Sequence, residues 1–251
     1  MMKKTFLIIL LFISYGLFAS DNDALVVKAN KAYSAGAYQQ AATLYQQVVS
    51  NGFEASELYY NLGNAYFKCN DMPSAILYYE KALKLNPRDE YVKNNIQVAN
   101  TKITDKILPL PELFYKRWWN ALQNLFEMDT WAVILIVNVV LFFIAISFYL
   151  ISNAMVVRKA SFWCGILLFI FSTFSFLFAS NRYHTLTRQK EAIIFSPSLT
   201  VKSSPDDNST DLFILHEGAK VSITDKVGQW REVKIANGSV GWVKAETFRE
   251  I

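Results

Sequence analysis

The chain has 251 residues, of which 53% are hydrophobic, 15% aromatic and only 18% charged, and its formal net charge is +4. This charge is modest and the basic residues do not gather on one predicted face, which argues against nucleic acid as a partner. The apolar residues are concentrated in blocks. The composition therefore predicts small soluble modules joined by membrane segments, and not one large globular domain.

The first apolar block lies at the N-terminus. Two lysines precede an apolar run from Phe6 to Phe18, and small residues and an acidic segment follow it. These features are typical of an export signal, so residues 1–20 are predicted to be a signal peptide. The basic end of such a signal stays in the cytoplasm, and the chain after Ser20 is therefore expected to be exported.

Two stretches, 22–55 and 56–89, repeat with a period of 34 residues. In the second, small residues recur where two antiparallel helices would approach closely, and a proline follows the second helix. These residues are Gly63, Ala75, Ala82 and Pro87. The pattern resembles the tetratricopeptide repeat (TPR) family. The segment that follows is polar and lacks a partner helix, so residues 22–105 are interpreted as two TPR repeats with a capping helix.

The TPR resemblance implies a concave groove, lined by the first helix of each repeat, that binds an extended peptide or a partner's helix. Carried onto this sequence, the groove comprises Val26, Asn30, Tyr33, Tyr60, Asn61, Asn64, Phe67 and Lys68. Family members that clamp a C-terminal carboxylate have a lysine at the position of Val26, so that clamp is incomplete here. Aromatic and amide groups favour peptide hydrogen bonding and stacking instead. The alternative is that the aromatic residues only form repeat core or a solvated face.

The segments after the repeats have the composition of a membrane anchor. Residues 106–129 combine aromatic and basic side chains, which predicts an interfacial linker helix; a linker helix packed on the TPR module is the alternative. Residues 130–152 and 161–180 are apolar runs long enough to cross a bilayer. Because the connection 153–160 is short, the two runs are expected to form a transmembrane hairpin.

The orientation of this hairpin follows from the predicted signal. An exported TPR module places the loop 153–160 in the cytoplasm, while the linker 181–191 and the C-terminal module return to the exported side. Basic residues flanking the spans on that side oppose the positive-inside rule, so the inverted arrangement stays open. No ionised residue lies within either span, which argues against a transporter or an ion path.

Residues 192–251 change to short β-rich runs separated by turn residues, and about five strands are predicted. Asn237 and Gly238 form a hairpin signal. The alternation predicts that the following residues face inward: Val221, Ile223, Trp230, Val233, Ile235, Val240, Trp242 and Val243. The order EGAKV, GQWREVKI, NGSVGWVKAETF closely resembles bacterial SH3 (SH3b) domains, which implies a small SH3-like barrel with a peptide or peptidoglycan ligand. Trp230 and Trp242 are the candidate ligand face; the alternative is that both are barrel core or rim.

The sequence offers no set of residues for catalysis. Two histidines, His184 and His216, and two cysteines, Cys69 and Cys164, are scattered without CxxC, nucleophile–base or metal-ligand spacing. The prediction is no catalytic residue, no cofactor and no metal. A redox-active enzyme, the third class of function considered, has no residues to carry it.

These predictions combine into a multi-module membrane protein with all-α TPR helical repeats, a two-helix transmembrane hairpin and a small all-β SH3-like barrel. This arrangement resembles the BatE family of the Bacteroides aerotolerance (Bat) operon over essentially the whole chain. The resemblance implies a periplasm-facing scaffold in the inner membrane, associated with oxygen or envelope-stress tolerance. Its implied partners are von Willebrand factor A-domain Bat proteins and other TPR Bat proteins, with a MoxR-type ATPase nearby. A receptor that senses peptidoglycan or peptide through its SH3b barrel is the alternative function.

Overall fold

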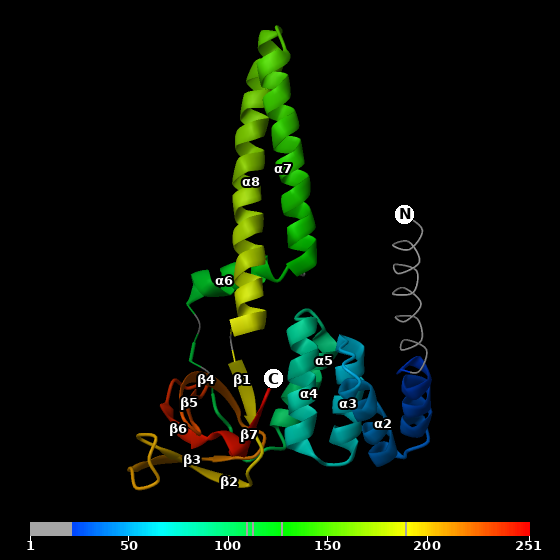
Figure 1. Ribbon diagram of the computed structural model, residues 1–251, viewed down its shortest axis with the longest axis vertical. Coiled ribbons are helices and arrows are strands. Elements are labelled where there is room, and N and C mark those ends of the chain that lie inside the picture. The colour runs from blue at the N-terminus through cyan, green and yellow to red at the C-terminus, as the bar shows by residue number, and fades with distance from the viewer. Residues whose placement is uncertain (1–21, 109, 112, 127, 189) are drawn as a thin grey trace, which may run out of the picture. The chain divides into compact units, whose positions relative to one another are not determined.

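The computed structural model of the chain describes residues 22–251 except 109, 112, 127 and 189. The predicted signal peptide, residues 1–20, lies outside the described residues. Two compact units make up the chain: the first combines Met1–Leu110 with Lys190–Ile251, and the second is Pro111–Gln189 (Figure 1). The helical repeats, the pair of long apolar helices and the antiparallel strand domain confirm the predicted fold class.

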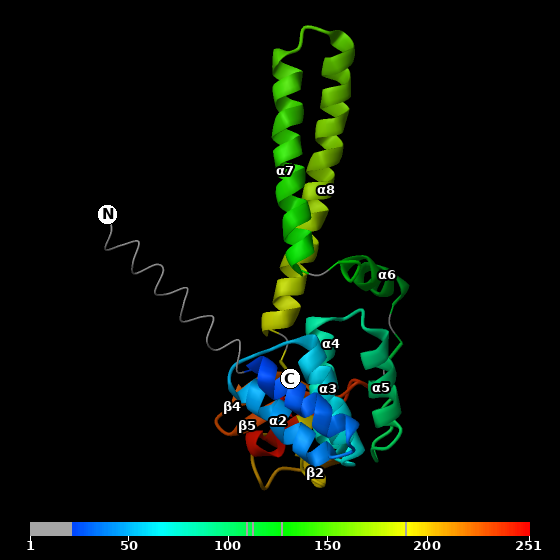
Figure 2. The ribbon, with the colours of Figure 1, turned by 90° about the vertical axis from the view of Figure 1, so that its right-hand side faces the viewer.

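The helical part of the first unit is a stack of antiparallel helices (Figures 1 and 2). It contains a helix at residues 22–34, then α2 (Tyr38–Ser50), α3 (Ser56–Lys68), α4 (Met72–Leu85) and α5 (Glu90–Asn100). Acidic side chains cap two of these helices: Asp71 accepts a hydrogen bond from the Ser74 amide, and Asp89 accepts from the amides of Tyr91 and Val92. These caps satisfy amides that have no partner inside the helix.

Gly63 explains why α3 and α4 pack so closely. A Cβ at this position would lie 2.6 Å from Cδ1 of Tyr79, so only glycine fits beneath that ring. Tyr79 is fully buried at the centre of the repeat core. The other large side chains that are fully buried in this core are Tyr45, Val48, Leu62, Ile76 and Val92. The small residue that marked the repeat in the sequence thus makes room for the aromatic ring that fills the core.

The strand part of the first unit is a seven-stranded antiparallel sheet with the order β3-β2-β6-β5-β4-β1-β7. Its strands are β1 (Lys190–Ile194), β2 (Ser198–Lys202), β3 (Asp211–His216), β4 (Lys220–Val227), β5 (Trp230–Lys234), β6 (Val240–Lys244) and β7 (Phe248–Glu250). The sequence predicted about five strands in residues 192–251, whereas the sheet has seven; β7 has only three residues, and β1 begins before the predicted boundary, at Lys190. The β5–β6 turn forms at Asn237 and Gly238, where the glycine has φ +92°. Glycine adopts this left-handed conformation without strain.

The predicted inward-facing residues of this barrel need correction. Val233 and Val243 do face the core, but Val240 is 41% exposed and Trp242 is half-buried on the opposite face of β6. Trp230 is buried, yet it lies opposite Lys244 and outside the central apolar cluster. The cause is the two-residue period of the strand: once Gly241 and Val243 point inward, Val240 and Trp242 must point outward.

Strand β1 lies between the two cores of the first unit and joins them. Ile193 is fully buried in the repeat core, whereas its neighbour Ile194 is fully buried in the barrel core. Alternation along the strand sends these side chains to opposite faces. Phe195 and Ile251 also pack against the repeat core, and Figure 1 shows β1 and β7 beside α4. The repeats and the barrel therefore form one packed body, which the sequence did not predict.

Polar contacts reinforce this junction. The Lys220 ammonium lies 2.9 Å from carboxylate oxygens of both Glu80 on α4 and Glu191 on β1. After α5, the carboxylate of Asp105 accepts a hydrogen bond from the His216 amide at 2.6 Å and lies 2.8 Å from the His216 ring nitrogen Nδ1. Burial lowers the pKa of Lys220, but the two carboxylates outweigh burial and the net shift is upward. Lys220 therefore stays charged and paired at neutral pH.

The second unit contains α6 (Phe114–Gln123), α7 (Met128–Ile151) and α8 (Met155–Arg188). The segments Asp129–Ile151 and Met155–Asn181 are long and apolar enough to cross a membrane, with mean hydropathies of 2.8 and 2.1. Their side chains are mostly exposed in the described chain, unlike those of a core helix in a soluble protein. Large exposed apolar surfaces of this kind are typical of membrane or protein-interaction sites.

Three boundaries in this unit differ from the prediction. The predicted loop 153–160 is shorter, because α8 already begins at Met155, and the predicted linker 181–191 is helical as far as Arg188. Among the described residues of the predicted interfacial segment 106–129, Phe114–Gln123 forms a separate helix, and α7 already begins at Met128. Charged and polar residues marked these stretches as non-spanning, but arginine and lysine favour helices, so a helix continues beyond the apolar run.

Helix α6 is attached to the base of the hairpin. The side-chain oxygen of Gln123 accepts a hydrogen bond from Asn181 at 2.6 Å, and its backbone oxygen accepts one from the indole of Trp131 at 2.9 Å. The Phe178 ring lies 4.9 Å from the rings of both Trp119 and Trp131. Gln123 is the buried residue of α6, and the residues Phe114 to Leu122 are exposed. The interfacial position of this helix stays a prediction.

Candidate partner-binding groove

The largest concentration of predicted site residues lies in a cavity of the repeat stack. This cavity has a volume of about 190 Å³ and is formed by the first helices of the repeats, residues 22–34, α3 and α5, with one side chain from α4. The residues that line it are Tyr33, Asn64, Phe67, Lys68, Tyr79, Asn95 and Val98. Four of these were predicted. Tyr79, Asn95 and Val98 were not.

Asn64 organises the floor of the groove. Its side-chain oxygen accepts hydrogen bonds from the Tyr79 hydroxyl at 2.7 Å and from the Asn95 amide at 2.9 Å. The Asn95 amide also lies 3.3 Å from the Tyr60 hydroxyl. The Asn64 oxygen accepts twice, and its NH₂ group has no hydrogen-bond partner among the described residues. Asn64, which lines the cavity, therefore retains donor capacity there.

Tyrosine hydroxyls in this region remain protonated. Burial, followed by the neighbouring tyrosines, raises the pKa of Tyr79 well above its usual range. Burial likewise raises the pKa of Tyr33, which packs edge-on against Tyr38 with ring centroids 5.2 Å apart. Because Tyr79 is neutral, its hydroxyl can donate to Asn64 and fix the orientation of that amide.

The remaining predicted groove residues lie outside the cavity lining. The Asn30 side chain accepts a hydrogen bond from the buried Tyr45 hydroxyl at 2.5 Å, which is a structural contact. Tyr60 packs on Tyr79 with ring centroids 6.1 Å apart, Val26 packs against the repeat core, and Asn61 is half-buried. The structure therefore brings together Tyr33, Asn64, Phe67 and Lys68, and it sets Val26, Asn30, Tyr60 and Asn61 beside them or behind them.

The groove is positively charged at one end. Lys68 lines it, and the Lys102 ammonium lies 5.5 Å from the centre of the Phe67 ring. No carboxylate is among the described residues that line the cavity. The surface thus combines an aromatic ring, a fixed amide and ammonium groups, which suits an extended segment with polar backbone and some negative charge.

The barrel carries the second predicted site. Trp242 is half-buried on the outer face, with Glu232 opposite it on β5 and Lys202 opposite it on β2. Trp230 lies on the same face but is only 8% exposed, and the Lys244 ammonium is 5.5 Å from the centre of its ring. Trp242 is therefore accessible to a ligand, whereas Trp230 is covered.

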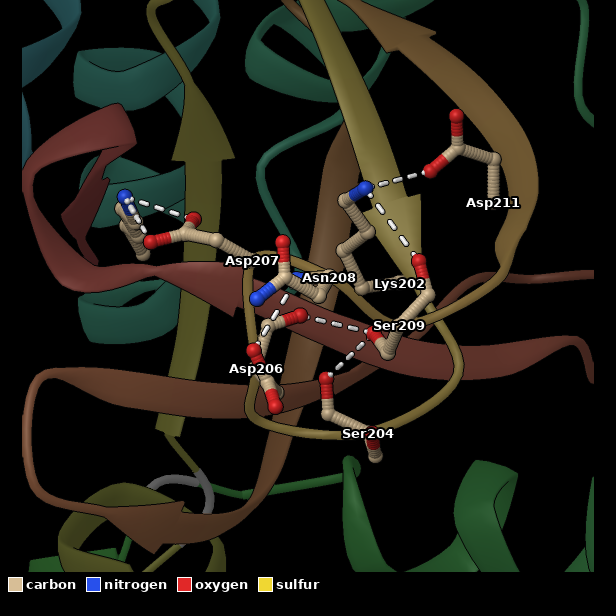
Figure 3. A network of polar contacts seen from close by, with 8 residues as sticks. Lys202, Ser204, Asp206, Asp207, Asn208, Ser209 and Asp211 are labelled. Carbon is tan, nitrogen blue, oxygen red and sulfur yellow. Dashed lines mark hydrogen bonds and ion pairs between the residues drawn. The ribbon is translucent and has the colours of Figure 1, made fainter.

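Polar contacts fix the loop 203–210 against the neighbouring strands (Figure 3). The Lys244 ammonium pairs with Asp207 at 2.8 Å, and the Lys202 ammonium pairs with Asp211 at 2.6 Å. The Ser209 hydroxyl donates to the backbone oxygens of Ser204 and Asp206, which closes the loop on itself (Figure 3). The hydrogen bond that the Lys244 ammonium donates to Asp207 is the main reason why the pKa of Lys244 is raised. The loop is thus held to β6 through Lys244, the residue whose ammonium also lies over the Trp230 ring.

Within the described part of the chain, no group of three or more His, Cys, Asp or Glu side chains lies close enough together to hold a metal ion. The geometry that is present suits binding: a groove on helical repeats and a tryptophan-bearing face on a small barrel. These features define a multi-module interaction protein.

Comparison with known proteins identifies both modules. The family described as tetratricopeptide repeat matches residues 56–89, and the family described as bacterial SH3 domain matches residues 197–248. The human Tetratricopeptide repeat protein 6 is 38% identical over 66 residues, which cover 26% of this chain and 13% of that protein. The chain thus spans a small part of that relative's length. A TPR repeat and a bacterial SH3 domain are present, and both are typically interaction modules without catalytic activity.

Proposed function

We propose that this protein is a membrane-anchored scaffold that binds an extended segment of a partner protein in its TPR groove. The observation that carries the proposal is the fixed amide of Asn64, which lines the cavity: its oxygen accepts from Tyr79 and Asn95, and its NH₂ group has no partner among the described residues. A groove that only served packing would not need an unpaired donor. Phe67 and Lys68 add stacking and charge on either side.

The two apolar helices support a membrane anchor, and the packed junction supports its topology. The TPR part precedes the hairpin in the chain and the barrel follows it, yet Ile193 and Lys220 of the barrel contact the repeats. These contacts require both parts to lie on the same side of a membrane, so the segment between them must cross it an even number of times. A hairpin of two spans, α7 and α8, meets this requirement.

The resemblance to the BatE family supports a more specific assignment. We infer an inner-membrane location with the TPR and SH3b parts facing the periplasm, in a Bat-type complex linked to aerotolerance or envelope stress. Von Willebrand factor A-domain Bat proteins and other TPR Bat proteins are the proposed partners. The orientation rests on the predicted signal peptide. Cysteines introduced into the barrel and labelled from outside in intact cells would test it.

Photo-crosslinking of the full-length chain in membranes tests the scaffold. A photoreactive amino acid at position 68 should capture the partner, and the same group at position 40, exposed on the second helix of the first repeat, should not. Asn64→Ala combined with Phe67→Ala should abolish the capture from position 68. Equal capture from positions 68 and 40, or capture that survives the double substitution, would reject the groove as the binding site.

The accessible Trp242 favours one second candidate function. A receptor that binds peptidoglycan or a peptide through its barrel would use this side chain, and the polar loop 203–210 would form one wall of its groove. Retention of the intact protein on purified cell wall, lost on Trp242→Ala, would support that function. Retention that does not depend on Trp242 would count against it.

A further inference from the structure

The connected end of the hairpin carries a feature that the scaffold function does not use. An open pocket of about 410 Å³ lies where the end of α7 meets the first turns of α8. We call it the tip pocket; the side chains that form it include Tyr149, Asn153, Arg158, Lys159, Phe162 and Trp163. It combines two cations with three aromatic rings, all of them exposed in the described chain.

The two cations of the tip pocket have no counter-ion in the hairpin. Residues 130–188 contain no aspartate or glutamate, and Asp129 stands at the far end of α7, about 30 Å away along the helix. Arg158 and Lys159 also lie within the first turns of α8, where the helix dipole favours negative charge and disfavours cations. Both effects leave a positive potential that an anion would neutralise.

Aromatic residues at the two ends of the hairpin predict the depth of the tip pocket in a membrane. The rings of Tyr149 and Phe162 lie 6.1 Å apart beside the cations, and Trp163 is 65% exposed. At the other end of the hairpin, Trp131 packs on Phe178. Trp131 and Tyr149 are separated by about 27 Å along α7, close to the roughly 30 Å thickness of a hydrocarbon core. Aromatic rings favour both interfaces of a bilayer, so the tip pocket lies at headgroup level.

We propose that the tip pocket binds the phosphate of an anionic phospholipid headgroup; this inference rests on the proposed membrane anchor. The Arg158 guanidinium, whose Cζ is 5.3 Å from the centre of the Tyr149 ring, and the adjacent Lys159 supply the charge for the phosphate. Guanidinium groups pair well with phosphate oxygens, and basic pockets between spanning helices suit anionic headgroups. Exposed Phe162 and Trp163 add apolar surface to the pocket that an acyl chain could cover, which favours a lipid over a free phosphate ion.

Native mass spectrometry of the detergent-purified full-length chain, mixed with equal amounts of phosphatidylglycerol and phosphatidylcholine, tests the proposal. Wild type should retain phosphatidylglycerol preferentially. Arg158→Gln combined with Lys159→Gln should reduce that preference by about fivefold for each cation removed. Arg158→Lys keeps the charge and should keep most of the preference. Lys116→Gln combined with Arg117→Gln removes the same charge from α6 and should leave it unchanged.

Two results would reject lipid binding by the tip pocket. Equal loss in the α6 control would show general attraction of lipid to positive charge, and displacement by millimolar inorganic phosphate would show a soluble anion site instead. Co-flotation with phosphatidylcholine vesicles separates this proposal from the anchor beneath it. If the protein floats but shows no lipid preference, only the pocket is rejected; if it does not float, the membrane anchor fails as well.

Discussion

The ion triad at the junction of repeats and barrel can be tested by Lys220→Met. The substitution keeps most of the side-chain volume but leaves Glu80 and Glu191, each 2.9 Å from the lost ammonium, facing each other without a cation. Breaking a fully buried pair costs about 3–5 kcal/mol. The Glu80 side chain is 11% exposed, but those of Lys220 and Glu191 are 37% exposed, so solvent reduces the cost to about 2–3 kcal/mol.

Thermal unfolding of the full chain in detergent, followed by tryptophan fluorescence, is the assay. For a body of about 150 residues, this cost corresponds to a fall in Tm of roughly 5–10 °C. Lys93→Met, which removes an exposed pair with Glu90 on α5, should change Tm by at most about 1–2 °C. Adding Glu80→Gln to Lys220→Met should recover part of the loss, because it removes the least solvated charge. Equal effects of the two lysine substitutions, or no recovery in the double variant, would refute the reasoning.

Three further predictions concern other parts of the molecule. Gly63→Ala should destabilise the repeats by about 2 kcal/mol in urea unfolding, because the new Cβ would collide with the Tyr79 ring. Gly36→Ala, at φ +80° with open space around it, should cost about 1 kcal/mol. A larger cost at Gly36 than at Gly63 would contradict the packing argument. Burial raises the pKa of Tyr79 above its ordinary value of 10.0, so its contribution to the free energy of unfolding should be constant to about pH 9 and fall as pH rises above 10. Tyr79→Phe should make the fall in stability above pH 10 shallower. An unchanged slope in this variant would exclude Tyr79 as a contributor. Gln123→Ala should weaken the attachment of α6 to the hairpin by about 1–2 kcal/mol. The measurement is hydrogen exchange over residues 114–123, which should become faster. Asn120→Ala, a substitution of an exposed residue on the same helix, should leave the exchange unchanged.

The parts of the fold that depend on local pattern were predictable from sequence. The 34-residue period placed Gly63 against an aromatic core, and the structure shows Tyr79 in that space. The apolar runs predicted the two long helices, and Asn237 with Gly238 predicted the β5–β6 turn. In each case the determining residues are neighbours in sequence or recur at a fixed spacing, so a single sequence contains the information.

The contacts between distant segments were not predictable in this way. Glu80 and Lys220 are 140 positions apart, and nothing in either local sequence indicates that they form a pair. Ile193 and Ile194 are consecutive apolar residues of a strand, and only the helices packed on its second face explain why both are buried. In the groove, Asn95 and Val98 were missed because α5 was interpreted as a solvated cap. Its first-helix position in the repeat order is the signal that could have identified them.

The repeats and the barrel form one packed body, but the ribosome synthesises them at different times. The repeats are made first, but Ile193, Lys220 and Ile251, which cover α4, emerge only after both membrane helices. About 140 residues separate Leu110 from the end of the chain, so at 5–20 residues per second the repeats wait roughly 10–30 s for the barrel. During this interval α4 exposes the apolar surface around Ile76 and the unpaired Glu80. A nascent chain arrested before the barrel should therefore be a target for chaperones or proteases on that side of the membrane.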